Sequence, residues 1–379
     1  MSSTTDLLSV RFGSEPVNYY AGSRLNRYSF LRTDELFLEG AVATPATRFV
    51  VFHRLAPWVV DGQSLAFFSL QQVALLVGDA VFSATAPLVV FLGVAEAEDG
   101  GAGIQTSSHG VVYGRPYFAI DATPRQPLLE EAARTFMDRQ TANGLSLLSD
   151  PRSMTLSPEA ASIFAQARSM IDWNTRNPFC AGCGRPTLSV QAGYKRICPS
   201  AEGEECPTHR AVSNVCFPRS DPTMIAAVVS ADGNRILLGR QARYPPRWYS
   251  CLAGFLEPGE SVEEAVRREV WEESGVKVGR VVIHSTQPWP YPSSLMLGAV
   301  AQALPGDEDI VLNDKELESA SWFSLEEVRN ALDEATVRSA PMSDVQDERA
   351  GLRVPPPQAI ANRLMTAVVQ GFLTGIPKI

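Results

Sequence analysis

The sequence has no long uninterrupted apolar run and is short of positive charge, with 33 Lys and Arg against 42 Asp and Glu. A membrane-spanning helix needs about 20 consecutive apolar residues, so we expect no membrane partner. Met1–Val10 is polar and lacks the basic and apolar segments of a secretory signal. The net charge of -9 argues against a general nucleic-acid binder, although a bound divalent metal can still attract a small anionic substrate.

Cysteine is also scarce, with six residues in the chain. Cysteines of a chain without a secretory signal are more often metal ligands or buried thiols than disulfides. Cys180, Cys183, Cys198 and Cys206 lie in a segment rich in Cys, Gly and Pro that cannot build a core alone. A closed four-sulfur site indicates structural Zn²⁺, and the second pair favours zinc over a redox role for the first. The long spacing before Cys206 leaves His209 as an alternative fourth ligand.

Apolar periodicity predicts an α+β protein with three parts. Residues 1–172 read as an N-terminal α/β scaffold domain, 173–217 as the cysteine-rich segment and 218–379 as a further region of strands and helices. The expected strands are Arg48–His53, Val89–Gly93, Tyr117–Ala122, Met224–Val229, Arg235–Gly239, Val281–Ser285 and Leu295–Ala303. The expected helices include Leu128–Gln140, Pro158–Asp172 with Ser157 as its cap, and Pro357–Phe372.

The most informative stretch runs from Gly254 to Val276. Pro258-Gly259 makes a turn, Ser261 is an N-cap candidate, and Glu264 three residues later completes a capping box. Gly275 is suited to end the helix in the left-handed conformation. The pattern therefore predicts a helix that begins just after Ser261 and ends at Gly275.

Carboxylates continue the apolar stripe of this helix. At about 100° per residue, the stripe of Val262, Ala265 and Val266 is followed by Glu269 and Glu273, with Glu272 alongside. Carboxylates crowded near a packed surface are costly unless a cation neutralises them, and Mg²⁺ prefers oxygen ligands. The alternative is a solvated acidic face with Arg267 and Arg268 as partners. The two glutamates on the stripe favour the metal site.

This stretch matches the Nudix box, Gly-x5-Glu-x7-Arg-Glu-U-x-Glu-Glu-x-Gly-U, where U is aliphatic. The matched positions are Gly254, Glu260, Arg268, Glu269, Val270, Glu272, Glu273, Gly275 and Val276. The resemblance implies that residues 218–379 are the catalytic domain, an α/β/α sandwich with a mixed sheet and a Mg²⁺ or Mn²⁺ site. It also implies a Nudix-like scaffold domain at 1–172 and a zinc ribbon at 173–217.

Within that resemblance we assign the metal ligands to Glu269, Glu272 and Glu273, one of which would also accept the proton of the attacking water. Arg268 would orient a carboxylate, and Glu260 would support the metal loop. The family's later glutamate matches Glu316, with Glu318 as the alternative.

A second array, Thr286-Gln-Pro-Trp-Pro-Tyr-Pro-Ser-Ser294, resembles the one that marks the NADH pyrophosphatase (NudC-like) branch, with departures at Thr286 and Tyr291. Its prolines make an extended segment that can present Trp289 and Tyr291 to a flat ligand. The resemblance implies that the substrate is bound by Phe217, Phe255, Gln287, Trp289, Ser294, Met296 and Ala361.

The branch implies hydrolysis of the pyrophosphate of NADH or NAD⁺ to AMP and the nicotinamide mononucleotide, by a homodimer. Removal of the NAD cap from RNA is the first alternative, because it cuts the same bond. A non-catalytic nucleotide-binding protein is the second, and the intact box glutamates argue against it. Pro377-Lys378-Ile379 weakly resembles the Ser-Lys-Leu address, which leaves peroxisome and cytoplasm as expected locations.

Overall fold

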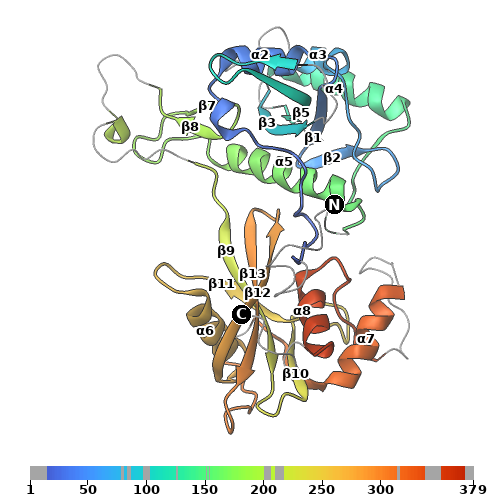
Figure 1. Cartoon of the computed structure of the whole chain (residues 1–379), viewed down its shortest axis with the longest axis vertical. Coiled ribbons are helices and arrows are strands. Elements are labelled where there is room, and N and C mark those ends of the chain that lie inside the picture. Colours follow the sequence, from blue (N-terminus) through green and yellow to red (C-terminus); the bar gives the residue numbers. More distant parts are fainter. Residues whose placement is uncertain are drawn as a thin grey trace. The chain divides into compact units, whose positions relative to one another are not determined.

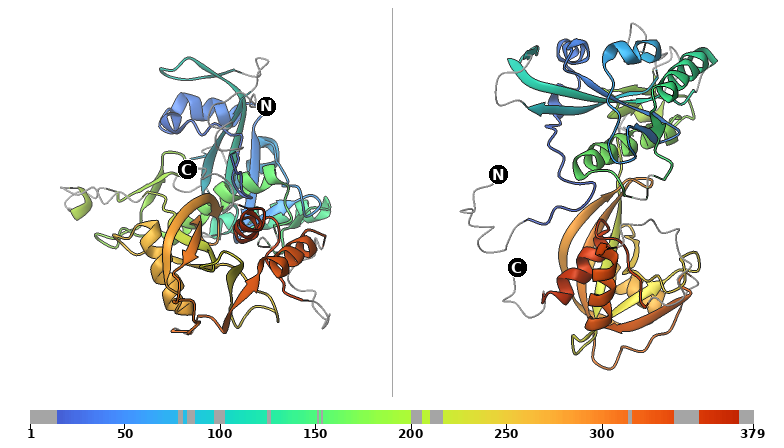
Figure 2. Two further views of the ribbon diagram at one scale, coloured as in Figure 1. Left: turned by 60° about the horizontal axis from the view of Figure 1, so that its bottom comes forward. Right: turned by 90° about the vertical axis from the view of Figure 1, so that its right-hand side faces the viewer.

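The computed structural model divides the chain into two compact units (Figures 1 and 2). The C-terminal unit comprises Met1–Ala21, Asp221–Trp289 and Ser294–Ile379, and the N-terminal unit comprises Gly22–Ser220 and Pro290–Ser293. The structure describes residues 15–77, 81–82, 87–96, 103–124, 127–150, 152, 154–199, 206–209, 217–313, 316–337 and 351–371. Among these residues, no helix has the length and apolar character needed to cross a membrane.

The N-terminal unit is built on a mixed sheet of six strands in the order β3-β5-β1-β2-β6, with β4 paired to β5. The strands are β1 Arg48–His53, β2 Ala56–Val59, β3 Val89–Glu96, β4 Gly103–Gln105, β5 Val111–Asp121 and β6 Ser146–Leu147. The helical elements are η1 Ser29–Leu31, α2 Glu35–Ala43, α3 Leu70–Val77, α4 Pro127–Ala142 and α5 Pro158–Arg176. The three strands and two helices predicted for this region are confirmed.

Phenylalanine dominates the core of this unit. Phe49 and Phe118 stack between β1 and β5, and Phe37 of α2 packs edge-on against Phe91 of β3. Phe52 turns to the opposite face of the sheet, where it stacks on Phe164 of α5. Helix α5 begins as predicted, since the Ser157 hydroxyl accepts from the Ala160 N–H. A small two-stranded sheet, β7 Leu188–Val190 with β8 Lys195–Ile197, and the short helix η3 Pro207–His209 follow.

The C-terminal unit holds a second mixed sheet, in the order β12-β13-β9-β10-β14 with β11 paired to β9. Only β13 and β9 run parallel among these pairs. The strands are β9 Asp221–Val229, β10 Arg235–Arg240, β11 Leu252–Phe255, β12 Val278–Trp289, β13 Ser294–Ala303 and β14 Ser319–Ser324. The helices are α6 Val262–Ser274, α7 Leu325–Val337 and α8 Ile360–Val369.

Successive side chains of β9 point to opposite faces of the sheet, and helices cover both faces, so the unit is a three-layer sandwich. Met224, Ala226 and Val228 face a core that contains the apolar side of α6. Ile225, Ala227 and Val229 face the other core, under α7 and α8. The sheet therefore lies between α6 and the pair α7 and α8 (Figure 1), which confirms the predicted α/β/α sandwich.

Candidate active site and cysteine cluster

Helix α6 has the ends that its sequence predicts. The Ser261 hydroxyl accepts from the Glu264 N–H at 3.2 Å, and the Glu264 carboxylate accepts from the Ser261 N–H at 2.7 Å. Gly275 adopts a left-handed conformation with φ 74° and donates its N–H to the Trp271 carbonyl. A side chain at Gly275 would also collide with Val311. Both ends of the carboxylate helix are thus fixed by local contacts.

The glutamates of α6 differ in burial. Glu273 is 2% exposed, the Glu269 side chain is 13% exposed, and the Glu272 side chain is 41% exposed. Burial raises the pKa of Glu269, and the charges of Glu272 and Glu316 raise it further, although Arg268 acts in the opposite direction. The inner carboxylates therefore lie where an additional cation would lower their free energy.

Arg268 connects the helix to the loop before it. Its guanidinium makes two bonds to Glu260, at 2.6 and 2.8 Å, and donates to the Phe255 carbonyl at 2.9 Å. Nη1 also donates to Glu269 and to Glu272, both at 2.9 Å. Hydrogen bonding from Arg268 lowers the pKa of Glu260 to about 2. Arg268 thus positions two of the helix carboxylates.

Gly254 lies directly against the Glu269 carboxylate. A Cβ at this position would lie 2.0 Å from Cδ of Glu269 and 2.2 Å from each of its oxygens. Such distances are far below any real contact, so β11 approaches α6 this closely only because residue 254 has no side chain. The glycine of the box therefore makes room for a carboxylate.

The structure distinguishes between the two later glutamates. Glu318 forms an ion pair with Arg240 and donates its backbone N–H to the Arg240 carbonyl. Glu316 is exposed, and its charge acts on the pKa of Glu269. Glu316 is accordingly the one that lies near the helix carboxylates.

The donor chemistry of this site suits a hard divalent cation, since every candidate ligand is a carboxylate oxygen. The oxygens are less tightly gathered than the sulfurs of the ribbon. Within the described ranges, the four cysteines are the only His, Cys, Asp or Glu group of three or more whose ligand atoms lie within 4.8 Å of one another. Two of the three helix glutamates are instead turned toward Arg268.

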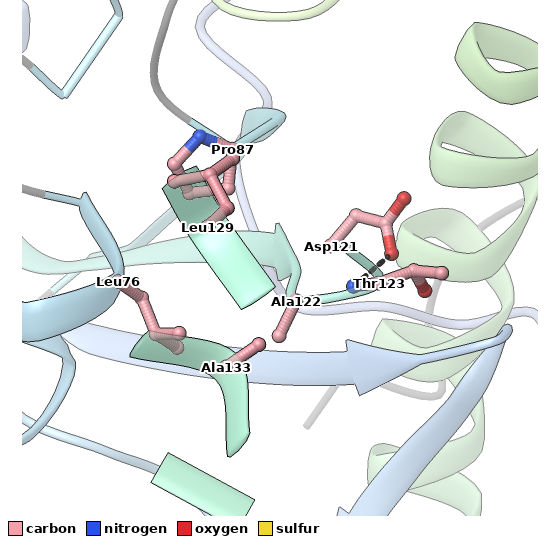
Figure 3. A pocket seen from close by; sticks show the side chains of 7 residues that line it. All are labelled: Leu76, Pro87, Asp121, Ala122, Thr123, Leu129 and Ala133. Atoms are coloured by element: carbon pink, nitrogen blue, oxygen red, sulfur yellow. Dashed lines mark hydrogen bonds between the residues drawn. The ribbon is translucent and has the colours of Figure 1, made fainter. Parts of the chain in front are cut away.

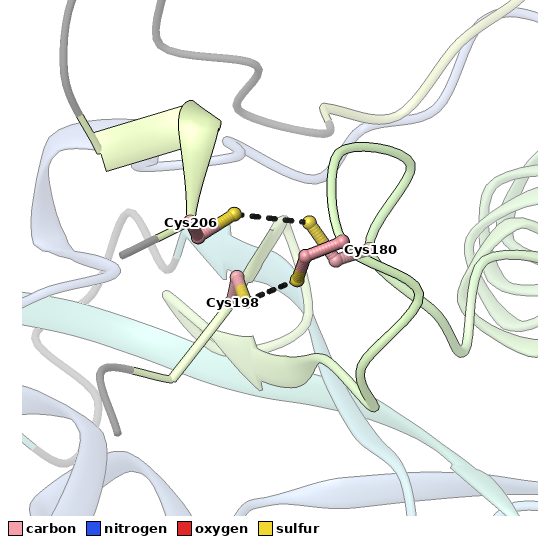
Figure 4. A group of neighbouring side chains, drawn as sticks. Cys180, Cys198 and Cys206 are labelled. Carbon is pink, nitrogen blue, oxygen red and sulfur yellow. Dashed lines mark hydrogen bonds between the residues drawn. The ribbon is translucent and has the colours of Figure 1, made fainter. Parts of the chain in front are cut away.

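Cys180, Cys183, Cys198 and Cys206 form that compact cluster (Figure 4). The sulfur atoms of Cys180 and Cys206 are 3.7 Å apart, and those of Cys183 and Cys198 are 3.4 Å apart. A tetrahedral Zn²⁺ with bonds of about 2.3 Å requires sulfur separations of about 3.8 Å. The Thr208 hydroxyl, which bonds the sulfur, lowers the pKa of Cys206 to about 6, which favours the thiolate that a metal needs.

Of the two candidates for the fourth ligand, Cys206 is in this cluster and His209 is not. Nε2 of His209 lies 3.1 Å from the Cys198 carbonyl in an exposed contact. The geometry therefore favours a four-sulfur site.

Gln287, a predicted substrate residue, is 1% exposed. Its Nε2 donates to the Tyr19 carbonyl at 3.0 Å and to the Gln358 carbonyl at 2.9 Å. Its Oε1 accepts from the Ile360 N–H, at the first residue of α8. The amide thus joins β12 to α8 and to the segment before Gly22.

The other predicted substrate residues have different exposures. Ser294 and Ala361 are 8% and 3% exposed, and Met296 is half-buried beside the core under α8. Trp289 is half-buried at the end of β12, opposite Ser294 of β13. Phe255 of the C-terminal unit and Phe217 of the N-terminal unit are 58% and 57% exposed, and both rings are accessible to a ligand.

Tyr291, expected beside Trp289 on a flat ligand, has protein partners within the N-terminal unit. Its ring lies 6.5 Å from that of Phe164. The Arg168 and Arg152 guanidinium groups lie 4.6 and 5.3 Å from its centroid. Packing against α5 thus accounts for this aromatic side chain.

Sequence reasoning missed the segment Val17–Ala21, which it placed in the N-terminal domain. The structure places it in the C-terminal unit, where Asn18 and Tyr20 are 4% and 3% exposed. The Tyr20 ring contacts Trp289 at 6.0 Å. The pair Tyr19-Tyr20 was the available signal, but no local pattern identifies its partner.

A shallow recess in the N-terminal unit is lined by Leu76, Pro87, Asp121, Ala122, Thr123, Leu129 and Ala133 (Figure 3). Its one carboxylate, Asp121, accepts from the backbone N–H of Thr123 at 3.1 Å. The lining is mostly apolar and offers no second charged group, so the recess does not have the cluster of polar groups that a catalytic or metal site needs.

Comparison with known proteins finds three family models along the chain. The NADH pyrophosphatase-like rudimentary NUDIX domain matches residues 46–173, the NADH pyrophosphatase zinc ribbon domain 175–201, and the NUDIX domain 221–345.

Two of the relatives match over nearly the whole chain, and a third matches over two thirds of it. An NAD-capped RNA hydrolase of Schizosaccharomyces pombe is 35% identical over 93% of both chains. The human NAD-capped RNA hydrolase NUDT12 is 36% identical over 92% of this chain and 72% of its own. The human mitochondrial NAD(P)H pyrophosphatase NUDT13 is 35% identical over 67% of this chain and 65% of its own.

Proposed function

The chain belongs to the NADH pyrophosphatase branch of the Nudix hydrolases, and from this we propose that it hydrolyses the pyrophosphate bond of NADH, NAD⁺ and related dinucleotides. The products are AMP and the reduced or oxidised nicotinamide mononucleotide. The observation that carries the proposal is the Glu269 carboxylate, held against Gly254 and beside the buried Glu273 on a helix whose box is complete.

Glu269, Glu272, Glu273 and Glu316 would hold Mg²⁺ or Mn²⁺. The metal, when bound, supplies charge neutralisation at the phosphates and a more acidic water. The chain's own contribution is placement: Arg268 fixes Glu269 and Glu272, and Glu260 fixes Arg268. One of the box glutamates accepts the proton of the attacking water.

Recognition of the bases falls to exposed aromatic faces. Phe255 and Phe217 are each more than half exposed, and aromatic rings stack on bases with little demand on base identity. Within the C-terminal unit, Trp289, Ser294, Met296 and Ala361 would contact the rest of the substrate, while Gln287 holds the ends of β12 and α8 in place.

NAD-capped RNA is a second candidate substrate, supported by the names of the relatives that match over 92–93% of this chain. Its hydrolysis breaks the same bond and releases nicotinamide mononucleotide, and the other product is an RNA with a 5′-monophosphate on its terminal adenosine instead of free AMP. The acidic balance of the chain offers little general attraction for RNA, so recognition would be limited to the cap.

We further propose Zn²⁺ for the cysteine cluster and a homodimer as the working form. The cluster supports the first through its four sulfurs, and family membership supports the second. A peroxisomal location rests on Pro377-Lys378-Ile379, which lies outside the described residues. Cytoplasm is the alternative.

A product analysis tests the activity. The full chain is incubated with Mg²⁺ or Mn²⁺ and a panel of NADH, NAD⁺, ADP-ribose, FAD, CoA and an NAD-capped RNA, beside Glu273→Gln as the disabled variant. We expect AMP release from NADH and its near loss in the variant, because an amide cannot replace the charge of a metal ligand. Equal turnover by both proteins contradicts the metal site, and preference for a nucleoside triphosphate contradicts the substrate class.

A further inference from the structure

The turn Asn18–Ala21 of the C-terminal unit lies beside Trp289, which the proposed function assigns to the dinucleotide site. We propose that this turn is a positioning element for dinucleotide binding, in which Tyr20 holds the ring of Trp289. The inference rests on the proposed function and adds a residue that neither the Nudix box nor the array around Trp289 contains.

Four hydrogen bonds fix this turn and the preceding Val17 to β12 and α8. Nδ2 of Asn18 donates to the Ser285 hydroxyl at 3.1 Å and to the Thr286 carbonyl at 2.8 Å. Nε2 of Gln287 donates to the Tyr19 carbonyl at 3.0 Å. Nη2 of Arg363 donates to the Val17 carbonyl at 3.2 Å. Because Asn18 is 4% exposed, replacing it by a residue without the amide would remove two buried or partly buried hydrogen bonds that hold the turn.

The backbone conformation of Tyr20 is unusual for its residue type. The Ala21 N–H donates to the Asn18 carbonyl at 3.0 Å and closes a turn, in which Tyr20 occupies the third position with φ 72°. Glycine or asparagine adopts this left-handed conformation at little cost, whereas a bulky residue does not. A strained tyrosine persists where its side chain has a use that offsets the strain.

The contact of the Tyr20 ring with Trp289 accounts for a tyrosine at this position. The two rings meet edge to face, with centroids 6.0 Å apart and planes at 76°. Tyr20 is itself backed by Tyr19, whose ring lies 4.5 Å away. Tyr20 is 3% exposed, whereas Trp289 is half-buried. The Trp289 ring can therefore contact a ligand while the Tyr20 ring behind it restricts the rotation of the Trp289 side chain. Restricting that motion before binding lowers the entropy lost on binding.

Tyr20→Leu tests this role, because it keeps an apolar side chain but removes the ring edge. We expect KM for NADH to rise about five- to tenfold, which corresponds to the free energy of one lost aromatic contact. The kcat should be nearly unchanged, because the substitution does not alter the glutamates of α6. Trp289→Leu should raise KM as well, and the double variant should match Trp289→Leu alone. Such non-additivity identifies residues that act through one another.

Tyr28→Leu is the matched control. Tyr28 is another tyrosine with positive φ, at 37°, and its hydroxyl bonds Glu96 within the N-terminal unit. Its replacement should leave KM for NADH unchanged. Asn18→Ala provides a second variant that keeps the Tyr20 ring but loosens the turn, and it should raise KM in the same direction as Tyr20→Leu.

Circular dichroism melts establish that each variant is folded. A folded Tyr20→Leu with the wild-type KM, or additive effects in the double variant, overturns the role of Tyr20. If Tyr20→Leu does not fold, an Asn18→Ala protein with the wild-type KM overturns it instead. A wild-type chain that releases AMP from no dinucleotide is a different result, because it overturns the proposed function itself.

Discussion

Replacing Gly254 by alanine should separate the activity of this enzyme from its stability. The new Cβ would lie 2.0 Å from Cδ of Glu269, whereas an ordinary contact begins at 3.4 Å, so the carboxylate must move by about 1.4 Å. Misplacing a reacting group by about 1 Å can cost about a hundredfold in rate. We therefore expect kcat/KM for NADH to fall about a hundredfold.

The fold should tolerate the same change. Gly254 does not have a positive φ, and alanine at a compatible glycine position stabilises a protein by about 0.4–1 kcal/mol through the unfolded chain. That gain offsets part of the clash, which falls on the end of a flexible side chain. We expect the free energy of unfolding to change by no more than about 1 kcal/mol.

Gly351→Ala is the control, because a Cβ there meets nothing within 4 Å and the φ is ordinary. Steady-state AMP release and urea denaturation measure the two quantities for both variants. Wild-type kcat/KM in a folded Gly254→Ala protein would refute the reasoning, since the position of the Glu269 carboxylate would then not matter. Activity and stability lost in proportion would also refute it.

Three further predictions concern the neighbouring residues and the ribbon. In Arg268→Lys, the lysine ammonium cannot form the bidentate hydrogen bond that the Arg268 guanidinium makes with Glu260. Its activity should fall about 10- to 100-fold and its half-saturating Mn²⁺ concentration should rise, whereas an unchanged metal titration would contradict the positioning role. The pKa of Glu260 is lowered from 4.5 to about 2, so the stability that this carboxylate adds is complete above pH 4.5 and is lost as the pH falls toward 2. Denaturation of wild type and Glu260→Gln should therefore converge in acid, and a constant difference between them would exclude this linkage. Cys206→Ser should lower bound zinc, measured by mass spectrometry, while His209→Ala retains it; the reverse would identify His209 as the ligand.

Local sequence patterns were sufficient to predict where helix α6 begins and ends. Ser261, Glu264 and Gly275 act through contacts within a few residues, and the structure confirms all three. Continuous apolar runs predicted strands β9 and β10, whereas the mixed order of the sheet followed only from the resemblance to the Nudix family. Elements without a strong local pattern were missed, among them β14, whose pairing with β10 joins Ile236 to Phe323.

The site was predictable to the extent that its residues share one helix. Spacing placed Glu269 and Glu273 on the buried side of α6, and their burial agrees. It did not reveal that Gly254 makes room for Glu269, because that contact joins a strand to a helix. The hydrogen bonds of Gln287 and the partner of Tyr20 were hidden for the same reason, since each joins residues at least 71 positions apart.

Asn18 and Ser285 are separated by 267 positions along the chain, which has a consequence for biosynthesis. The ribosome releases the Asn18 turn long before β12 and α8 exist, so the turn must wait while the intervening residues emerge and fold. Closing so long a loop carries an entropic cost that only the finished sheet can offset. The nucleotide pocket should therefore mature late, after translation has passed α8, and partly synthesised chains should remain inactive even when their N-terminal unit is folded.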